Sequence, residues 1–422
     1  MDYRIKHGIR TGNIKVPASK SYAHRMLISA ALGNKNCIIE CDGISKDIKA
    51  TADCLTALGA KICIEASKIS VKPVDRAGKI SEETIMLPCN ESGSTLRFLT
   101  PVVGALGVKA AFVMQGKLAE RPMAELTDEL ERHGMSFDRK DNILYCFGRL
   151  NSGEYSIPGN ISSQYITGLL FALPLLEGDS ILRVTGNMES ADYVVMTEKV
   201  LEAAGVRVRM QDGVYHIKGS TIYNPPVESV VEGDWSNAAF YACMGAMSDN
   251  GVVLQHMRLD SCQGDKAIIE ILKEFGADVQ TSDNDIKISK GDLKGITVDA
   301  KPIPDLVPAI SALAAYAEGT TRITNAGRLR MKESDRLKTT TDMLRSLGAD
   351  ITEYEDELVI VGMDGLDGGT ADGANDHRIA MAAAVAACGC RADVTVLGAE
   401  CVAKSYPDFW KDLESLTLVS NT

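Results

Sequence analysis

One short segment of the chain carries charged residues in a pattern that could bind an anion and move a proton. Residues 328–336 read Arg-Leu-Arg-Met-Lys-Glu-Ser-Asp-Arg, with four cations and two carboxylates inside an otherwise apolar stretch. A charge run is usually a solvated helix face, and Glu333 and Arg336 have the i,i+3 spacing of a purely structural pair. Fixed cations beside a carboxylate are also what a general acid–base group needs for work on an anionic substrate.

Basic residues recur just before or at the start of other expected helices. Helix N-termini bind anions because unpaired N–H groups and the positive end of the helix dipole lie there. Any one site is equally well a capped helix: Ser19 or Ser21 could cap the helix expected over 26–32, and Asp376 and His377 could be an N-cap and a core histidine. Six such positions in different parts of the chain indicate a shared, strongly anionic ligand, and they are Lys20, Arg97, Arg121, Arg336, Arg378 and Lys404.

Two more helix starts have groups suited to an anion. Residues 91–97, Glu-Ser-Gly-Ser-Thr-Leu-Arg, form a small-residue turn whose backbone N–H groups around Gly93 could cradle a phosphate or carboxylate. Ser162, Ser163 and Gln164 open another apolar helix, where simple capping explains them as well. The chain contains neither a P-loop nor a dinucleotide-binding fingerprint.

These segments belong to a repeated unit. An amphipathic helix ends in Leu-x-x-x-Gly, and an apolar strand, a polar turn and a second strand follow. The glycines are spaced 71 to 75 residues apart, and each is expected to end its helix in the left-handed conformation: Gly59, Gly134, Gly205, Gly276 and Gly348. The strands expected after them include 61–65, 206–210 with 214–217, and 350–353 with 358–361.

The repeat predicts the domain organisation. Five units are complete, and a sixth starts near Asn375 and ends at a helix over 408–416 without its strand pair. Residues 1–16 hold two strand-like runs, which we expect to complete the sixth unit. Six units suit two domains of three, with an active site between them. The expected domains are residues 19–228 and residues 1–18 plus 229–422.

Composition excludes several classes of function. A net charge of −12 argues against a nucleic-acid partner, which requires a basic face. No apolar run is long enough to span a membrane, and residues 1–10 lack the apolar core of a secretory signal, so we expect a cytoplasmic protein. The eleven cysteines are expected to be free thiols, and no zinc-binding spacing occurs.

The motifs together resemble those of the 5-enolpyruvylshikimate-3-phosphate (EPSP) synthase family, in order and spacing, from Val16 to Pro407. The resemblance rests on Lys20-Ser21…Arg25, Ser92-Gly-Ser-Thr-Leu-Arg97, Glu120-Arg-Pro122, Ser162-Ser-Gln164, Pro304-Asp305, Lys332-Glu-Ser-Asp-Arg336, Asp376-His-Arg378 and Ala403-Lys404…Pro407. It implies an α/β fold of two domains, each an inside-out barrel of three βαβαββ units, and a monomer. The N-terminal domain would hold mainly the shikimate 3-phosphate side.

The resemblance also implies the reaction and the residues that carry it. The family transfers the enolpyruvyl group of phosphoenolpyruvate to shikimate 3-phosphate and releases phosphate, with no metal or organic cofactor. Asp305 resembles the base for the substrate hydroxyl, and Glu333 resembles the group that protonates and deprotonates the methylene carbon. Lys20 is the third residue expected to be catalytic. Shikimate 3-phosphate is expected at Lys20, Ser21, Arg25, Ser162, Ser163, Gln164, Ser190, Asp305 and Lys332. Phosphoenolpyruvate is expected at Lys20, Gly93, Arg97, Arg121, Gln164, Arg336, Arg378 and Lys404.

Two positions depart from the family pattern. Glu91 stands in the phosphoenolpyruvate turn where the family usually has Asn, and His24 stands where the first motif usually has Asn. A carboxylate beside an anionic substrate is unfavourable unless it points away or pairs with a cation.

Two other functions remain as alternatives. A UDP-N-acetylglucosamine enolpyruvyl transferase shares the fold and the donor, but that family usually carries a cysteine at about residues 112–123, where this chain has none. A non-catalytic sensor of anionic metabolites could keep the basic residues but would not need Glu333 and Asp305. Phosphate release with each acceptor discriminates between the three.

Overall fold

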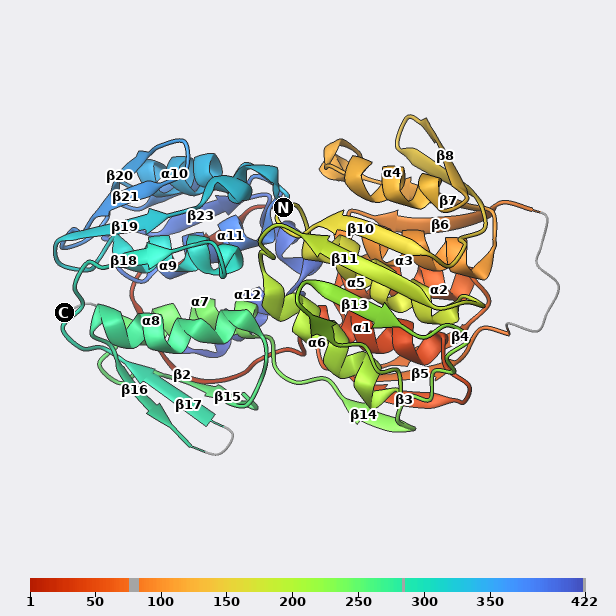
Figure 1. Cartoon of the computed structure of the whole chain (residues 1–422). Coiled ribbons are helices and arrows are strands. Elements are labelled where there is room, and N and C mark those ends of the chain that lie inside the picture. The colour runs from red at the N-terminus through yellow and green to blue at the C-terminus, as the bar shows by residue number, and fades with distance from the viewer. Residues whose placement is uncertain (76–82, 283–284, 420–422) are drawn as a thin grey trace. The chain divides into compact units, whose positions relative to one another are not determined.

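The computed structural model describes residues 1–75, 83–282 and 285–419, which form two compact units (Figure 1). Unit 1 contains Met1–Ser19 and Glu232–Thr422, and unit 2 contains Lys20–Val231. The backbone therefore passes from one unit to the other twice, after Ser19 and after Val231.

Unit 2 is built from three four-stranded sheets with one βαβαββ pattern. In each sheet the first two strands are parallel, and a hairpin adds the last two in antiparallel fashion. The first sheet comprises β6 (Ile85–Asn90), β7 (Ala110–Met114), β8 (Met135–Lys140) and β9 (Ile143–Gly148), with α3 (Gly93–Leu106) and α4 (Ala124–Arg132). The second comprises β10 (Glu154–Pro158), β11 (Ser180–Thr185), β12 (Met210–Gln211) and β13 (Val214–Ile217), with α5 (Ser163–Ala172) and α6 (Ala191–Ala203).

The third sheet of unit 2 closes with a strand from the end of the unit. It comprises β3 (Cys37–Glu40), β4 (Lys61–Glu65) and β5 (Lys68–Lys72), with α1 (Lys20–Ala31) and α2 (Lys46–Ala57). Its first strand is β14 (Glu228–Val230), which pairs in parallel with β3 through Glu228↔Ile38.

Unit 1 repeats the pattern with helices α7 (Trp235–Ala246), α9 (Val307–Ala314) and α11 (His377–Ala387) at its centre. All residues of α9 and α11 are buried, because these helices are apolar or small-residue on every face. The strands around them bury one face only. The middle sheet comprises β18 (Thr297–Asp299), β19 (Thr320–Thr324), β20 (Asp350–Glu353) and β21 (Leu358–Val361), and α10 (Arg336–Ser346) packs beside it.

The N-terminal strands complete two sheets of unit 1 rather than one. β1 (Tyr3–Ile5) pairs with β23 (Val394–Leu397) beside β22 (Gly369–Asp372), which confirms that the N-terminus completes the sixth unit. β2 (Ile9–Lys15) instead serves as the first strand of another sheet. That sheet comprises β2, β15 (Val252–Gln255), β16 (Asp278–Thr281), β17 (Asp285–Ser289) and β24 (Thr417–Val419), with α8 (Ile268–Phe275). The expectation that both runs serve the sixth unit was therefore wrong, as was its start near Asn375, since β22 precedes that residue.

The glycine punctuation predicted by the repeat is confirmed. The five glycines after α2, α4, α6, α8 and α10 have φ values of 75° to 104°, which L side chains rarely adopt. One expected strand was wrong: residues 206–209 form no ladder and only Met210–Gln211 pairs, because the partner β13 begins at Val214. The apolar helix expected from Met26 was also wrong in its start, since α1 begins at Lys20.

The cysteines are free thiols, as expected, and nine of the eleven are buried. Within the described ranges, no helix is long and apolar enough to cross a membrane.

Candidate active site

Arg336 is the centre of a buried ion network in unit 1. It is the first residue of α10, and its side chain is 1% exposed. Its guanidinium donates through Nη1 to Asp305 Oδ1 at 2.7 Å and through Nη2 to Glu333 Oε2 at 2.6 Å. The two residues predicted to exchange protons are thus held on neighbouring nitrogens of one planar group.

Asp376 fixes the third side of Arg336. It accepts from Nε at 2.8 Å and also caps α11, accepting from the Arg378 backbone N–H at 3.0 Å. Burial would raise the pKa of Asp376, but Arg336 holds it below its usual value. A fully buried N-cap therefore ties the start of α11 to the start of α10, although its sequence signal was only that of a plain cap.

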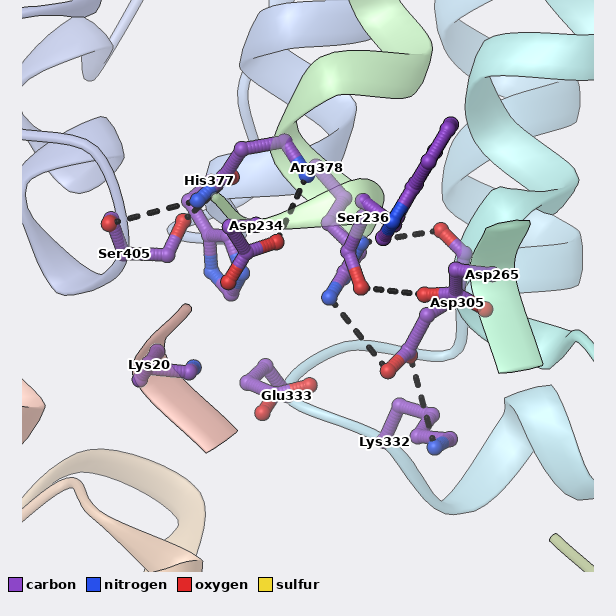
Figure 2. A network of polar contacts seen from close by, with 12 residues as sticks. Lys20, Asp234, Ser236, Asp265, Asp305, Lys332, Glu333, His377, Arg378 and Ser405 are labelled. Carbon is purple, nitrogen blue, oxygen red and sulfur yellow. Dashed lines mark hydrogen bonds and ion pairs between the residues drawn. The ribbon is translucent and has the colours of Figure 1, made fainter. Parts of the chain in front are cut away.

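Asp305 lies among three cations, and Figure 2 shows two of them, Lys332 and Arg378. Lys332 Nζ is 3.5 Å from Oδ1, and Arg378 Nη2 is 3.3 Å from Oδ2, while Arg336 makes the bond described above. Burial alone would raise the pKa of Asp305, but Arg378, Lys332 and Arg336 hold it well below its usual range. Asp305 is therefore ionised at neutral pH and can accept a hydrogen bond or a proton. Burial lowers the pKa of Lys332.

Lys404 contacts the residues just before α11. It ends a 3-10 turn, Ala399–Lys404, and its Nζ donates to the Asn375 carbonyl at 2.6 Å, next to the cap of α11. The helix expected over 408–416, shortly after Lys404, is α12 (Phe409–Ser415).

In unit 2, four of the predicted residues meet at the start of α3. Ser92 caps that helix, and Gly93 is its first residue. A Cβ at Gly93 would lie 2.6 Å from Arg97 Nη1 and 2.9 Å from Arg121 Nη1, so both guanidiniums reach the bare backbone of the turn. Arg97 Nη1 also donates to Gln164 Oε1 at 3.1 Å. Backbone N–H groups and two cations therefore face the same point, which suits a phosphate or carboxylate.

A glycine explains how Gln164 reaches Arg97. In α5, a Cβ at Gly168 would lie 2.4 Å from the Arg97 carbonyl oxygen, so only glycine lets the two helix backbones approach this closely. Gln164 lies one turn earlier in α5, and its Nε2 donates to Ser94 Oγ at 3.0 Å. Ser162 caps α5 by accepting from the Gln164 N–H.

Lys20 and Arg25 lie in the first two turns of α1. Lys20 Nζ is 3.0 Å from Asp47 Oδ2. The buried Arg25 donates to the Ser21 carbonyl at 2.6 Å, to the Tyr193 carbonyl at 2.8 Å and to Thr197 Oγ1 at 2.9 Å. These bonds join α1 to the first turns of α6, where Ser190 occupies the cap position with φ 53°.

His24 and Glu91, the two residues that depart from the expected pattern, both have identifiable neighbours in the structure. His24 is buried and neutral, because burial holds its pKa well below the usual value, and its Nδ1 lies 2.6 Å from Thr51 Oγ1. The Glu91 carboxylate lies against Gly116, where an added Cβ would be 2.8 Å from Cδ. Glu91 thus points toward the 3-10 turn Gly116–Glu120.

A family model for EPSP synthase (3-phosphoshikimate 1-carboxyvinyltransferase) matches residues 7–413. The chain belongs to the EPSP synthase family. Relatives named 3-phosphoshikimate 1-carboxyvinyltransferase include one from Clostridium acetobutylicum, 42% identical over 96% of this chain and 95% of the relative. Another, from Clostridioides difficile, is 39% identical over 96% of this chain and 95% of the relative.

Solved structures agree with this EPSP synthase assignment. An EPSP synthase from Acinetobacter baumannii matches with a TM-score of 0.84 and 26% identity, over 99% of this chain and 98% of that one. The enolpyruvyl transferase NikO from Streptomyces tendae has a TM-score of 0.79 at 17% identity over 99% of both chains, which shows a shared fold. The two-domain enolpyruvyl transferase fold expected from the sequence is thereby confirmed.

Two buried acids of unit 1, Asp265 and Asp234, were not identified in the sequence analysis. Asp234 caps α7 by accepting from the Asn237 N–H at 2.8 Å. Asp265 occupies nearly the same place in its repeat as Arg336 does, just before an amphipathic helix, and that position could have singled it out. Among residues 1–75, 83–282 and 285–419, no group of three or more His, Cys, Asp or Glu side chains is arranged to hold a metal ion.

Proposed function

We propose a residue-level account of this chain's reaction as a 3-phosphoshikimate 1-carboxyvinyltransferase of the shikimate pathway. The enzyme transfers the enolpyruvyl group of phosphoenolpyruvate to the 5-hydroxyl of shikimate 3-phosphate and releases phosphate. The observation that carries the account is the single guanidinium of Arg336 on which Asp305 and Glu333 converge.

Phosphoenolpyruvate is assigned to the basic groups at four helix starts, those of α1, α3, α10 and α11, and to the residues around them. The Gly93 turn with Arg97 and Arg121 supports this assignment in unit 2, since both guanidiniums meet the bare backbone there. Gln164 joins that group through Arg97, and Lys20 contributes from the start of α1. Arg336, Arg378 and Lys404 supply the cations of unit 1.

Shikimate 3-phosphate is assigned to hydroxyl, amide and basic groups. Ser162, Ser163 and Gln164 at the start of α5 offer donors for the ring and its phosphate, and Ser190 adds a further hydroxyl at the start of α6. Lys20, Ser21, Arg25 and Lys332 supply the remaining polar and charged contacts, and Asp305 accepts from the reacting hydroxyl.

The chemistry requires two proton-transfer groups with separate roles. Glu333 gives a proton to the methylene carbon C3, which develops positive charge at C2, and the 5-hydroxyl oxygen attacks C2 while Asp305 takes its proton. The carbon–oxygen bond to phosphate then breaks, and Glu333 recovers a proton from C3. Asp305 passes the hydroxyl proton to the released phosphate or to water, and the fixed cations stabilise the departing phosphate.

Substrate binding would make Asp305 a stronger base. The pKa of Asp305 is depressed by Arg378, Lys332 and Arg336. In the ternary complex the two anionic substrates also pair with these cations. The cations then stabilise the Asp305 carboxylate less, and the pKa of Asp305 rises. The base is thus weak until both substrates are in place.

The test is phosphate release with phosphoenolpyruvate, with and without shikimate 3-phosphate, for the wild type and Glu333→Gln. We expect release only with both substrates, and a loss of at least about 100-fold in kcat for the variant. Glu357→Gln, which alters a glutamate paired with the half-exposed Arg322, is the matched control and should match the wild type. Release with UDP-N-acetylglucosamine instead would assign the chain to the sister reaction, and no release with either acceptor would favour a sensor.

We also propose that the enzyme is a cytoplasmic monomer. Light scattering during size-exclusion chromatography tests the monomer, for which a mass near 45.3 kDa is expected. Cell fractionation tests the location.

A further inference from the structure

Asp265 is a buried acid beside the network that the mechanism uses. It lies in the 3-10 turn Gly264–Ala267, ahead of α8, and is 3% exposed. Ser236, in the first turn of α7, donates a short hydrogen bond to Asp265 Oδ2. Figure 2 shows this pair joined by a dashed line, beside Asp305.

The charges around Asp265 come from several elements. Asp305 at the start of α9 and Asp234 at the start of α7 repel a negative charge on it, while Arg378 in α11 and the Ser236 hydroxyl stabilise one. Burial is the largest influence, and the pKa of Asp265 is raised from 3.8 to about 7. Asp265 and Asp305 are therefore neighbouring acids in different charge states just below neutral pH.

We propose that Asp265 sets the charge felt by Asp305 and Arg378 and so serves as a positioning residue for the transfer reaction. The inference rests on the proposed roles of these two residues. Below neutral pH, Asp265 is protonated and uncharged, and Arg378 pairs with Asp305 and with the incoming anion. Above neutral pH, ionised Asp265 attracts Arg378 and repels phosphoenolpyruvate.

A positioning role of Asp265 that acts through its charge depends on pH, whereas a purely structural role does not. A carboxyl that merely joins the 3-10 turn to α7 would act equally at every pH. A charge that appears near pH 7 beside a phosphoenolpyruvate ligand should instead raise the KM for this substrate as the pH passes through that value.

The experiment measures kcat and KM for phosphoenolpyruvate from about pH 5.5 to about pH 8.5 in the wild type and in Asp265→Asn. Asparagine keeps the size and the hydrogen bond to Ser236 but cannot ionise. We expect similar KM values at the acid end and a several-fold lower KM in Asp265→Asn at the alkaline end. Ionisation of the substrate phosphates affects both proteins alike and cancels in the ratio.

Two further variants complete the test. Ser236→Ala removes a donor that stabilises ionised Asp265, so the KM step should move to higher pH. Asp412→Asn is the matched control: Asp412 is another acid of unit 1 with a raised pKa, it accepts from Tyr406 Oη, and its substitution should leave the step in place. Asp265 can also be followed without substrate, as a carboxyl ¹³C resonance that titrates near pH 7 in the wild type and is missing in Asp265→Asn.

The outcomes separate this inference from the function it rests on. An active wild type whose KM ratio to Asp265→Asn does not change with pH would overturn the proposal, as would a step that Ser236→Ala leaves unmoved. If Asp265→Asn fails to fold, the Ser236→Ala profile and the wild-type carboxyl titration decide alone. A wild type without phosphate release would instead overturn the proposed function, while the carboxyl titration would still report on Asp265.

Discussion

Arg336 organises three carboxylates, and its shape matters as much as its charge. Its Nε and Nη2 donate to Asp376, its Nη1 donates to Asp305, and its Nη2 also donates to Glu333. A lysine ammonium is a compact charge and cannot hold three acids at fixed angles. The arrangement therefore requires arginine.

We expect Arg336→Lys to lose both activity and stability. The acids would be left partly unpaired and buried, so kcat should fall by about 100-fold or more and the free energy of unfolding by about 3 kcal/mol. Phosphate-release assays and urea unfolding measure the two effects. Arg322→Lys is the control, because Arg322 is half-exposed in its pair with Glu357 and should cost under about 1 kcal/mol. Equal behaviour of the two variants would contradict the role given to Arg336.

Asp265 should make stability depend on pH in a window of its own. Its pKa is about 7 in the folded protein against 3.8 as the ordinary value, so between these values the folded state keeps a proton that the unfolded state has lost. Raising the pH through this window therefore destabilises the wild type, by up to about 1.4 kcal/mol for each pH unit. Asp305 and Asp376 have lowered pKa values and act with the opposite sign only below about 3.8.

The measurement is the urea unfolding free energy of the wild type and Asp265→Asn from about pH 4.5 to about pH 7.5. The difference should shift in favour of Asp265→Asn as the pH rises, and level off above about 7. A constant difference would show that Asp265 does not hold its proton.

At the scale of elements, the sequence predicted helix ends better than helix starts. The glycines that end α2, α4, α6, α8 and α10 were predictable, because few residues other than glycine adopt the left-handed backbone conformation at a helix end. The start of α1 was not, because Lys20, Ser21 and Arg25 are polar and an apolar run was taken to define the helix. Those polar residues form the first turns of α1, where Lys20 pairs with Asp47 and Arg25 binds α6.

The contact of α3 with α5 provides an element-scale test. In Gly168→Ala the new methyl group would lie 2.4 Å from the Arg97 carbonyl and must push the helices apart. We expect a loss of about 2 kcal/mol in unfolding free energy and a several-fold rise in KM for phosphoenolpyruvate, since Gln164 would leave Arg97. Gly153→Ala is the control, because its Cβ would meet only the His133 ring at 3.4 Å or more. A normal KM in Gly168→Ala would contradict this role for the contact.

A buried hydrogen-bond chain gives His24 a role that joins three helices. Thr95 Oγ1 donates to the capping Ser92 Oγ at 2.7 Å, so Thr51 must donate to Thr95 Oγ1, also at 2.7 Å. His24 must then donate its Nδ1–H to Thr51. The cap of α3, which precedes Gly93, is thus fixed from α1 through α2.

We therefore expect His24→Asn to be tolerated and His24→Leu to be harmful. Asparagine can still donate to Thr51, whereas leucine leaves that hydroxyl without its donor at a cost of about 1–3 kcal/mol. Urea unfolding compares the two variants, and ¹⁵N spectra of the wild type should show a neutral Nδ1–H tautomer. An Nε2–H tautomer would refute the chain as drawn.

For the whole molecule, the family and fold could be predicted from the sequence, but the pairing of charges could not. Repeats and motifs recur at fixed spacing and can be recognised in the sequence itself. Asp305, Arg336 and Asp376 instead come from three separate helix starts, and their pairing depends on the fold. Only packing decides which carboxylate meets which nitrogen. The same holds for β2 and β14, whose partners lie more than one repeat away along the chain.

This topology predicts an order of folding. The sheet of β6, β7, β8 and β9 is drawn from one continuous segment, whereas β2 pairs with β15 some 240 residues away and β14 closes the β3 sheet from the end of unit 2. Long loops must close before such ladders form, so they should form late. Pulsed hydrogen exchange during refolding should therefore protect β8 and β9 first, and β2 and β14 last. Early protection of β2 would mean that the N-terminal strand guides the assembly of unit 1 instead of completing it.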